Sequence, residues 1–170
     1  MSLKIIVCVK QVIDPDAPIA SLGIGEDNIV FSKEKQFVIN GYDENAVEAA
    51  LQIKDDIGAE ITVLSIGSDF ENDVVKKPIS MGADRLILVK DSMLRFLDGF
   101  TTAELLGKAI DKIGKFDLVL CGRQASDLDN AYVPLALSEI LNVACVTLAQ
   151  KIDVNANGVR IERVMSGGDQ

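Results

Sequence analysis

Four short apolar runs dominate this sequence, and segments with helical spacing separate them. The runs are rich in β-branched residues and cover residues 4–9, 60–65, 85–89 and 116–121. Runs that are apolar on both faces and bounded by turn residues are typical of buried strands in a parallel sheet. Because such strands need crossover connections, helices are expected on both faces of the sheet. The sequence therefore predicts an α/β fold, a three-layer α/β/α domain with a mostly parallel, doubly wound sheet.

Helical spacing fills the segments between and after the apolar runs. Four helices are expected, at residues 43–57, 71–81 and 102–113, and from a start within 129–133 to about residue 141. Asp43 is expected to be the N-cap of the first helix. Pro78 lies inside the second and should kink or shorten it.

Two segments fall outside this alternation. Residues 11–42 form a long connection after the first strand, with a small hairpin expected between residues 29–31 and 36–39. Loops of this length are usually functional. At the other end, residues 143–150 and 159–165 are expected to form an antiparallel pair, joined by an Asn-Gly turn within residues 155–158. The chain is expected to be a single nucleotide-binding-type domain over residues 1–170, truncated at its C-terminal end, because the last residues are polar and follow two strands directly.

Charge and composition exclude several classes of function. Seventeen basic and twenty-six acidic side chains give a net charge of −9, which opposes binding to nucleic acid or to an anionic membrane. The chain has no histidine, so Ser-His-Asp triads and imidazole metal sites are excluded. The first apolar run is too short to insert into a membrane. Three distant cysteines without a C-x-x-C motif suit a reducing, cytoplasmic location.

Candidate site residues gather where predicted strands end. In a doubly wound sheet, ligands bind outside the carboxyl ends of the strands, at the point where the strand order reverses. Gly122 follows the fourth strand and permits a tight turn, and Arg123 adds a positive charge, so this loop could bind a phosphate through its N–H groups. Asp127 and Asp129 oppose a phosphate there, and their simplest role is to cap the next helix. The two carboxylates could also share a magnesium ion, but the chain has no phosphate-binding motif to accompany one.

Other residues near this edge have two plausible roles each. Neither the Gly-rich dinucleotide fingerprint nor the P-loop motif is present, so any nucleotide is bound by another arrangement. Lys10 is either a cation of the pocket or a long side chain at its rim. Cys8 and Cys121 both end strands and are either core residues or reactive thiols, and small buried thiols of this kind are mostly core residues.

Four stretches of the sequence together resemble the β-subunit family of electron transfer flavoproteins. They are KIIVCVKQV at residues 4–12, NGYDENA at 40–46, MGADR at 81–85 and LCGRQA at 120–125. Their order and spacing are specific, and the resemblance covers essentially all 170 residues.

The resemblance implies a subunit without catalytic residues that supports electron transfer from acyl-CoA or other dehydrogenases to a downstream acceptor. It implies an α subunit as partner, which carries the electron-transferring FAD, and a bound AMP or second FAD in this chain. It implies no metal. The nucleotide-binding positions that it implies are Cys8, Asn40, Gly41, Tyr42, Asp43, Ile66, Gly122, Arg123, Gln124, Ala125, Ser126, Asp127, Asp129, Asn130 and Val133.

The sequence departs from the family pattern at several positions. Gly41 stands where proline is usual, and the loop before the fourth helix lacks the family's Thr, Gln and Gly, with Pro134 one residue early. Family members also continue into a C-terminal segment that wraps around the α subunit. The altered loop leaves open an alternative, a universal-stress-like domain that binds ATP or AMP as a regulator. An enzyme of adenylation or phosphoryl transfer would need a phosphate-binding motif, which this chain lacks.

Overall fold

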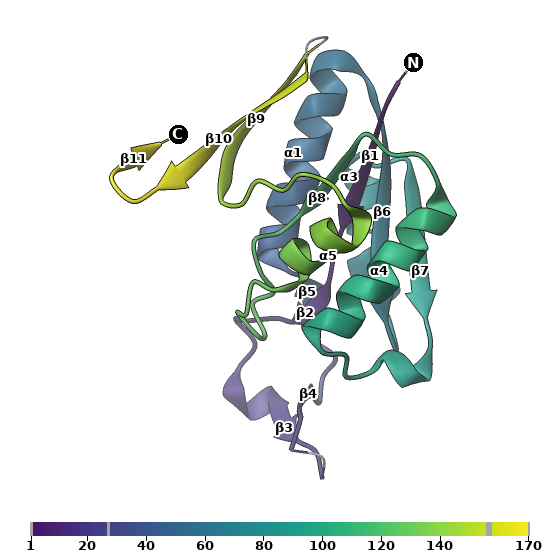
Figure 1. Ribbon diagram of the computed structural model, residues 1–170. Helices are drawn as coiled ribbons and strands as arrows, with labels where there is room; N and C mark the ends of the chain where they lie inside the picture. Colours follow the sequence, from purple (N-terminus) through teal and green to yellow (C-terminus); the bar gives the residue numbers. More distant parts are fainter. Residues whose placement is uncertain (1, 27, 156–157, 170) are drawn as a thin grey trace.

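The computed structural model describes residues 2–26, 28–155 and 158–169. Its centre is a parallel sheet of four strands in the order β7-β6-β1-β8 (Figure 1). The strands are β1 (Leu3–Cys8), β6 (Ala59–Gly67), β7 (Arg85–Lys90) and β8 (Leu118–Cys121). They form where the four apolar runs were predicted, which confirms the α/β fold.

Helices cover both faces of this sheet. On one face, α1 (Gly41–Ile57) packs on side chains of β1, β6 and β8 through Ala46, Val47, Ala50 and Ile53. On the other face, α4 (Gly99–Ile113) and α5 (Val133–Leu141) cover Ile6, Cys8 and Leu64. The alternate residues of β1 thus enter two separate apolar layers, as expected for a strand buried on both sides.

Several helix boundaries differ from those predicted. The helix expected at 71–81 is two short ones, α2 (Asn72–Val75) and α3 (Lys77–Met81), and Pro78 lies in the first turn of the second, where a missing N–H is tolerated. The fourth strand begins at Leu118 and α4 begins at Gly99, with the Asp98 carboxylate accepting from the Thr101 N–H at 2.7 Å. The expectation that Asp43 is the N-cap of α1 is wrong, because the N-cap position is Asn40 and the Asp43 side chain has other partners.

The long connection contains two strand pairs. β2 (Gln11–Ile13) pairs with β5 (Phe37–Ile39), and β3 (Leu22–Ile24), which follows the short helix η1 (Ile19–Ser21), pairs with β4 (Val30–Ser32). The predicted hairpin between residues 29–31 and 36–39 is therefore wrong: both segments are extended, but each pairs with an earlier strand. The β3–β4 hairpin projects beyond the carboxyl ends of the main strands (Figure 1).

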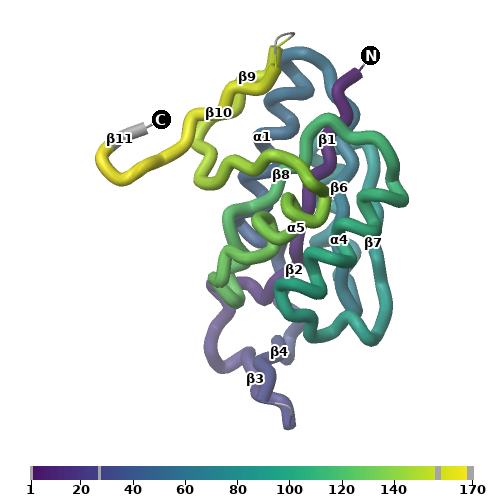
Figure 2. Tube along the Cα trace, in the orientation of Figure 1, coloured from purple at the N-terminus to yellow at the C-terminus, as the bar shows by residue number. Residues whose placement is uncertain are grey.

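The C-terminal part forms its own antiparallel sheet of β9 (Ala149–Asn155), β10 (Gly158–Met165) and β11 (Gly168–Asp169). The predicted strand pair is confirmed, but its first strand begins at Ala149 rather than at residue 143. Residues 156–157 of the predicted Asn-Gly turn lie outside the described residues. Ile152 and Val154 pack against the α1 side of the core, while the rest of the sheet extends away from the body (Figure 2).

No helix within the described residues combines the length and the apolar character needed to cross a membrane.

Candidate functional site

The strand order reverses between β1 and β8, which places the candidate site at their carboxyl ends. From β1 the chain continues to β6 and β7 on one side, and β8 then joins the sheet on the other side. Cys8 and Cys121, the last residues of these two strands, are register partners. The segments that follow them, from Val9 and from Gly122, therefore start side by side, where ligands of doubly wound sheets bind.

Asp43 joins these two segments. Its carboxylate accepts a hydrogen bond from the Lys10 N–H at 2.8 Å and another from the Gly122 N–H at 3.1 Å. The side chain reaches this position from the first turn of α1 and is buried there. Burial raises the pKa of the Asp43 carboxyl to about 6, while hydrogen bonds from Asn40, Lys10 and Gly122 act in the opposite direction. Asp43 is thus a structural bridge across the switch point.

Asn40 holds the next part of the same loop. It is 1% exposed, its amide Nδ2 donates to the Gln124 carbonyl at 2.8 Å, and its Oδ1 accepts from the Ser126 N–H at 3.1 Å. Donor and acceptor of one side chain are thereby both satisfied by backbone groups, as a buried amide requires. The start of α1 therefore fixes the backbone of residues 122–126.

Two polar contacts lie on the outer side of the loop. Lys10 Nζ donates to both Asp127 oxygens at 2.8 and 2.6 Å, and Gln124 Nε2 donates to Asp129 at 2.7 Å. The two carboxylates thus have different partners, which is not the arrangement of a shared magnesium site. Lys10, for which the sequence left open a pocket cation or a rim residue, is not among the positions implied by the family resemblance, but the structure places its Nζ on this loop. Its position directly after the first strand was the available signal.

Gly122 is required by the close approach of α1. A Cβ atom built on it would clash with Asp43 Oδ1 and would lie 2.6 Å from the Tyr42 carbonyl carbon and 2.7 Å from the Asp43 amide nitrogen. Only a residue without a side chain fits there. The absence of a side chain at Gly122 therefore leaves room for the bridging Asp43 carboxylate, in addition to the tight turn expected there.

Side chains of the chain itself take two of the N–H groups in the loop where a phosphate site was expected. Asp43 and Asn40 already accept from the N–H groups of Gly122 and Ser126. By contrast, within the described residues the backbone N–H groups of Asn130, Ala131, Tyr132 and Val133 make no hydrogen bond. They precede or open α5, a helix end that favours anions. Unpaired donors therefore lie in both halves of the loop within the described residues, and those of residues 130–133 are the ones at a helix start, where Pro134 supplies none.

The other predicted positions divide into two groups. Tyr42, Arg123 and Asn130 are exposed at this edge, and Gly41 opens α1 with free space around it. Cys8, Ile66 and Val133 belong to the apolar layer beneath the loop, and Ala125 accepts backbone bonds from Leu128 and Asp129. The loop therefore combines an exposed polar rim with an apolar floor.

Ser65 is a further buried polar group near this edge. It precedes Ile66 on β6, is 1% exposed, and its hydroxyl has no partner within the described residues. Because Ser65 ends an apolar run, the sequence gave no indication that it is a candidate site residue.

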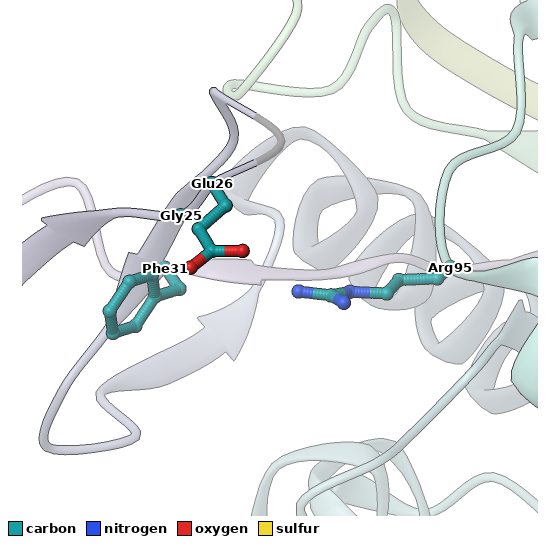
Figure 3. A pocket seen from close by; sticks show the side chains of 4 residues that line it. All are labelled: Gly25, Glu26, Phe31 and Arg95. Atoms are coloured by element: carbon teal, nitrogen blue, oxygen red, sulfur yellow. The ribbon is translucent and has the colours of Figure 1, made fainter.

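A separate open depression of about 580 Å³ lies between the β3–β4 hairpin and the segment before α4. Gly25, Glu26, Phe31 and Arg95 line it, and the Glu26 and Arg95 side chains point toward each other across it (Figure 3). None of its lining residues belongs to the Asp43 bridge, and we do not assign the candidate site to it.

Within the described residues, no three His, Cys, Asp or Glu side chains come together as a metal site.

Comparison with known protein families identifies the family of this chain. Residues 28–170 match the model of the electron transfer flavoprotein domain. The chain belongs to the electron transfer flavoprotein family. The matched segment includes Asn40, Asp43 and the whole loop after β8, but not β1.

Curated relatives agree with this family. The chain is 35% identical over 131 residues, 77% of its length, to the electron transfer flavoprotein subunit beta of Thermoanaerobacterium thermosaccharolyticum. It is 32% identical over 98% of its length to the acryloyl-CoA reductase electron transfer subunit gamma of Anaerotignum propionicum. It is also 32% identical, again over 98% of its length, to the caffeyl-CoA reductase-Etf complex subunit CarD of Acetobacterium woodii.

The chain spans 50%, 62% and 63% of the lengths of these three relatives, respectively. The resemblance noted in the sequence is confirmed. The comparisons do not favour the alternative of a universal-stress-like regulator.

Proposed function

We propose that this chain is the β-type subunit of an electron transfer flavoprotein and that it binds an adenine nucleotide without catalysing a reaction itself. The observation that carries the proposal is the match of residues 28–170 to the electron transfer flavoprotein domain. The α subunit of the heterodimer would hold the electron-carrying FAD, with acyl-CoA or other dehydrogenases as donors. A cytoplasmic location suits these partners.

The two halves of the loop after β8 suit different parts of a nucleotide. The unpaired N–H groups of residues 130–133, at the start of α5, suit the phosphate. The Asp127 and Asp129 carboxylates and the exposed Asn130 amide suit ribose hydroxyls. The apolar residues beneath the loop, among them Ile66 and Val133, suit the flat face of an adenine.

The charges at the site favour few phosphates. Asp127 already binds Lys10, and Asp43 and Asn40 accept from the N–H groups of Gly122 and Ser126. A long phosphate chain would have to displace these contacts or lie against the carboxylates. AMP therefore fits this site better than ATP, and FAD, with its adenosine in the same place, is the second candidate.

In this role the nucleotide, when bound, is a structural component, and a bound FAD would add a redox-active flavin. The residues of this chain bind and orient: Asn40 and Asp43 hold the loop, and the start of α5 presents its donors.

The test is to identify the ligand that the chain retains. The purified chain is denatured and the released molecules are identified by mass spectrometry, after an absorption spectrum of the native sample. AMP without yellow colour supports the proposal in its first form, and FAD supports its second. If no nucleotide is released, titration calorimetry with AMP, FAD and ATP decides, and failure to bind AMP or FAD contradicts nucleotide binding.

A matched pair of variants assigns the site. Asn130→Pro removes one of the unpaired backbone donors and should weaken AMP binding, whereas Asp117→Asn, at the opposite edge of the sheet, should not. Co-purification with a coexpressed α subunit tests the heterodimer independently. A chain that binds AMP but never joins an α subunit would contradict the electron-transfer role while leaving the nucleotide site intact.

A further inference from the structure

Two cysteines meet at the switch point of the sheet. Cys8 ends β1, Cys121 ends β8, and the two are register partners in the parallel pairing of these strands. Residues opposite one another on neighbouring strands point their side chains to the same face of the sheet. Both thiols accordingly belong to the apolar layer under α4 and α5. The neighbouring Cys121 side chain also raises the pKa of the Cys8 thiol.

The spacing is compatible with a bond between them. Neighbouring strands lie about 4.8 Å apart, and Cα atoms of disulfide-linked cysteines are usually about 4.4–6.8 Å apart. The Cβ atoms must approach each other slightly. Because both cysteines are the last residues of their strands, this movement involves only the strand ends. Asp43 already holds Lys10 and Gly122, just beyond them, on the two oxygens of one carboxylate.

The two thiols differ in accessibility. Cys8 is 7% exposed, and the contact with Cys121 together with burial raises its pKa well above the ordinary value. Cys8 is therefore shielded from solvent and is not the thiol that a dissolved oxidant meets first. Cys121 is only half-buried and lies where the loop after β8 begins. An oxidant from solvent reaches Cys121 first.

We propose that Cys8 and Cys121 form a redox-active pair that a hydroperoxide oxidises to a disulfide between the ends of β1 and β8. With hydrogen peroxide, the Cys121 sulfur attacks one peroxide oxygen and the O–O bond breaks. The departing hydroxide takes the Cys121 thiol proton and leaves as water, and Cys121 becomes a sulfenic acid. The Cys8 sulfur then attacks the Cys121 sulfur, the S–S bond forms, the S–O bond breaks, and the departing hydroxide takes the Cys8 proton as a second water. Two electrons pass from the thiols to the peroxide, and a dithiol reductant reverses the change.

The bond would act directly on the loop that follows Cys121. Gly122 comes next in the chain and has no space to move toward α1. Drawing Cys121 toward β1 therefore shifts the loop of residues 122–130. We expect weaker AMP binding in the oxidised form, an effect that rests on the proposed nucleotide site, whereas formation of the disulfide does not.

The test uses the Cys145→Ser variant, which leaves only Cys8 and Cys121 of the three cysteines. The variant is treated with one equivalent of hydrogen peroxide, remaining thiols are alkylated after denaturation, and tryptic peptides are mapped by mass spectrometry. The expected result is a cross-linked peptide containing Cys8 and Cys121, in a monomeric chain, that dithiothreitol splits again. Finding Cys8 fully alkylated, or only disulfides between chains, would overturn the proposal.

A second variant separates a reactive pair from two unrelated thiols. With Cys8→Ala added, the sulfenic acid on Cys121 has no partner and should proceed to the sulfinic acid, which dithiothreitol does not reduce. Equal over-oxidation of Cys121 with and without Cys8 would contradict the pairing. If Cys8→Ala fails to fold, the natural chain replaces it, with the exposed Cys145 alkylated first and the same peptide sought. AMP titration of the oxidised and reduced forms then measures the effect on the loop.

Discussion

One aspartate carboxylate accepts hydrogen bonds at the carboxyl ends of the central strands, here called the carboxyl edge, and another does so at their amino ends, the amino edge. The first carboxylate is buried and the second is exposed. At the carboxyl edge, the buried Asp43 carboxylate accepts from the backbone N–H groups of Lys10 and Gly122. At the amino edge, the Asp84 carboxylate accepts from the Ile61 N–H at 2.8 Å and from Lys54 Nζ at 2.7 Å, in an exposed position. Each aspartate joins separate segments of the chain.

Their pKa values move in opposite directions. Burial raises the pKa of Asp43 to about 6 in spite of its hydrogen bonds. Hydrogen bonds from Ile61 and Lys54 lower the pKa of Asp84, because there is little burial to oppose them. The ionised carboxylate thus costs stability at the carboxyl edge and adds stability at the amino edge. An edge that holds a costly buried charge is organised for something other than stability, which fits its proposed role as the ligand edge.

The largest loss of stability is expected at the carboxyl edge, from Gly122→Ala. The added Cβ meets Asp43 and the Tyr42 backbone, so the loop must move away from α1 and the bridge must open. We expect the free energy of unfolding to fall by about 3 kcal/mol. Gly41→Ala is the matched control, because nothing lies within 4 Å of a Cβ at that position, and it should change stability by less than about 1 kcal/mol. Urea denaturation of both variants measures the difference, and equal midpoints would contradict the close packing at Gly122.

The next effect is a dependence of stability on pH that originates from Asp43. Its folded pKa of about 6 lies above the ordinary value of 3.8, so between these pH values the folded chain binds more protons than the unfolded chain. The stabilising contribution is therefore complete below about pH 3.8 and is lost as the pH rises through about 6, a change of up to about 3 kcal/mol. Urea denaturation between about pH 4 and about pH 8 should show this decline.

Asp43→Asn removes this titrating group and is the control for the pH experiment. Relative to the natural chain, the variant should gain stability as the pH rises from about 4 to about 7. A difference between the two proteins that is constant over this range would show that Asp43 titrates normally.

Asn40→Ala is expected to have a smaller effect at the same edge. The substitution leaves the Gln124 carbonyl and the Ser126 N–H without their partner, in a part-buried setting. We expect a loss of about 2 kcal/mol and faster amide hydrogen exchange in residues 122–129. Gln52→Ala is the control on the same helix, since its contact with Glu48 is exposed, and it should lose less than about 0.5 kcal/mol. Unchanged exchange in the loop would mean that Asn40 does not hold it.

The elements of the fold could be predicted from the sequence where the cause is local. The apolar runs that became β1 and β6 carry their burial on both faces, and Pro78 limits the helix around it. Strand pairing in the long connection was not predictable, because β5 pairs with β2 across the whole β3–β4 hairpin. Short antiparallel strands have little in their own residues to select a partner.

The role of Asp43 was missed because it also depends on contacts between residues far apart in the sequence. Its identity and position at the start of a helix predict capping, which is a local role. Its actual partners, Lys10 and Gly122, lie 33 and 79 residues away in the sequence. Lys10 likewise acquires its role from Asp127, which lies 117 residues away. Sequence reasoning located the edge of the sheet but could not give the contacts made across it.

The smallest effect is expected at the amino edge, from Asp84→Asn. An asparagine can still accept from the Ile61 N–H, but it presents an amide instead of a carboxylate to Lys54. Because this pair is exposed, the loss at neutral pH should be about 1 kcal/mol or less, and it should shrink further in high salt. The folded pKa of Asp84 is lowered, so its contribution is present above the ordinary value of 3.8 and is lost as the pH falls through the folded pKa. Denaturation midpoints of variant and natural chain should therefore converge in acid, the opposite of the Asp43 pattern. If Asp84→Asn instead lowered the free energy of unfolding as much as Gly122→Ala, substitutions would be no better tolerated at the amino edge than at the carboxyl edge. The difference in burial between the two carboxylates would then not explain how the two edges differ.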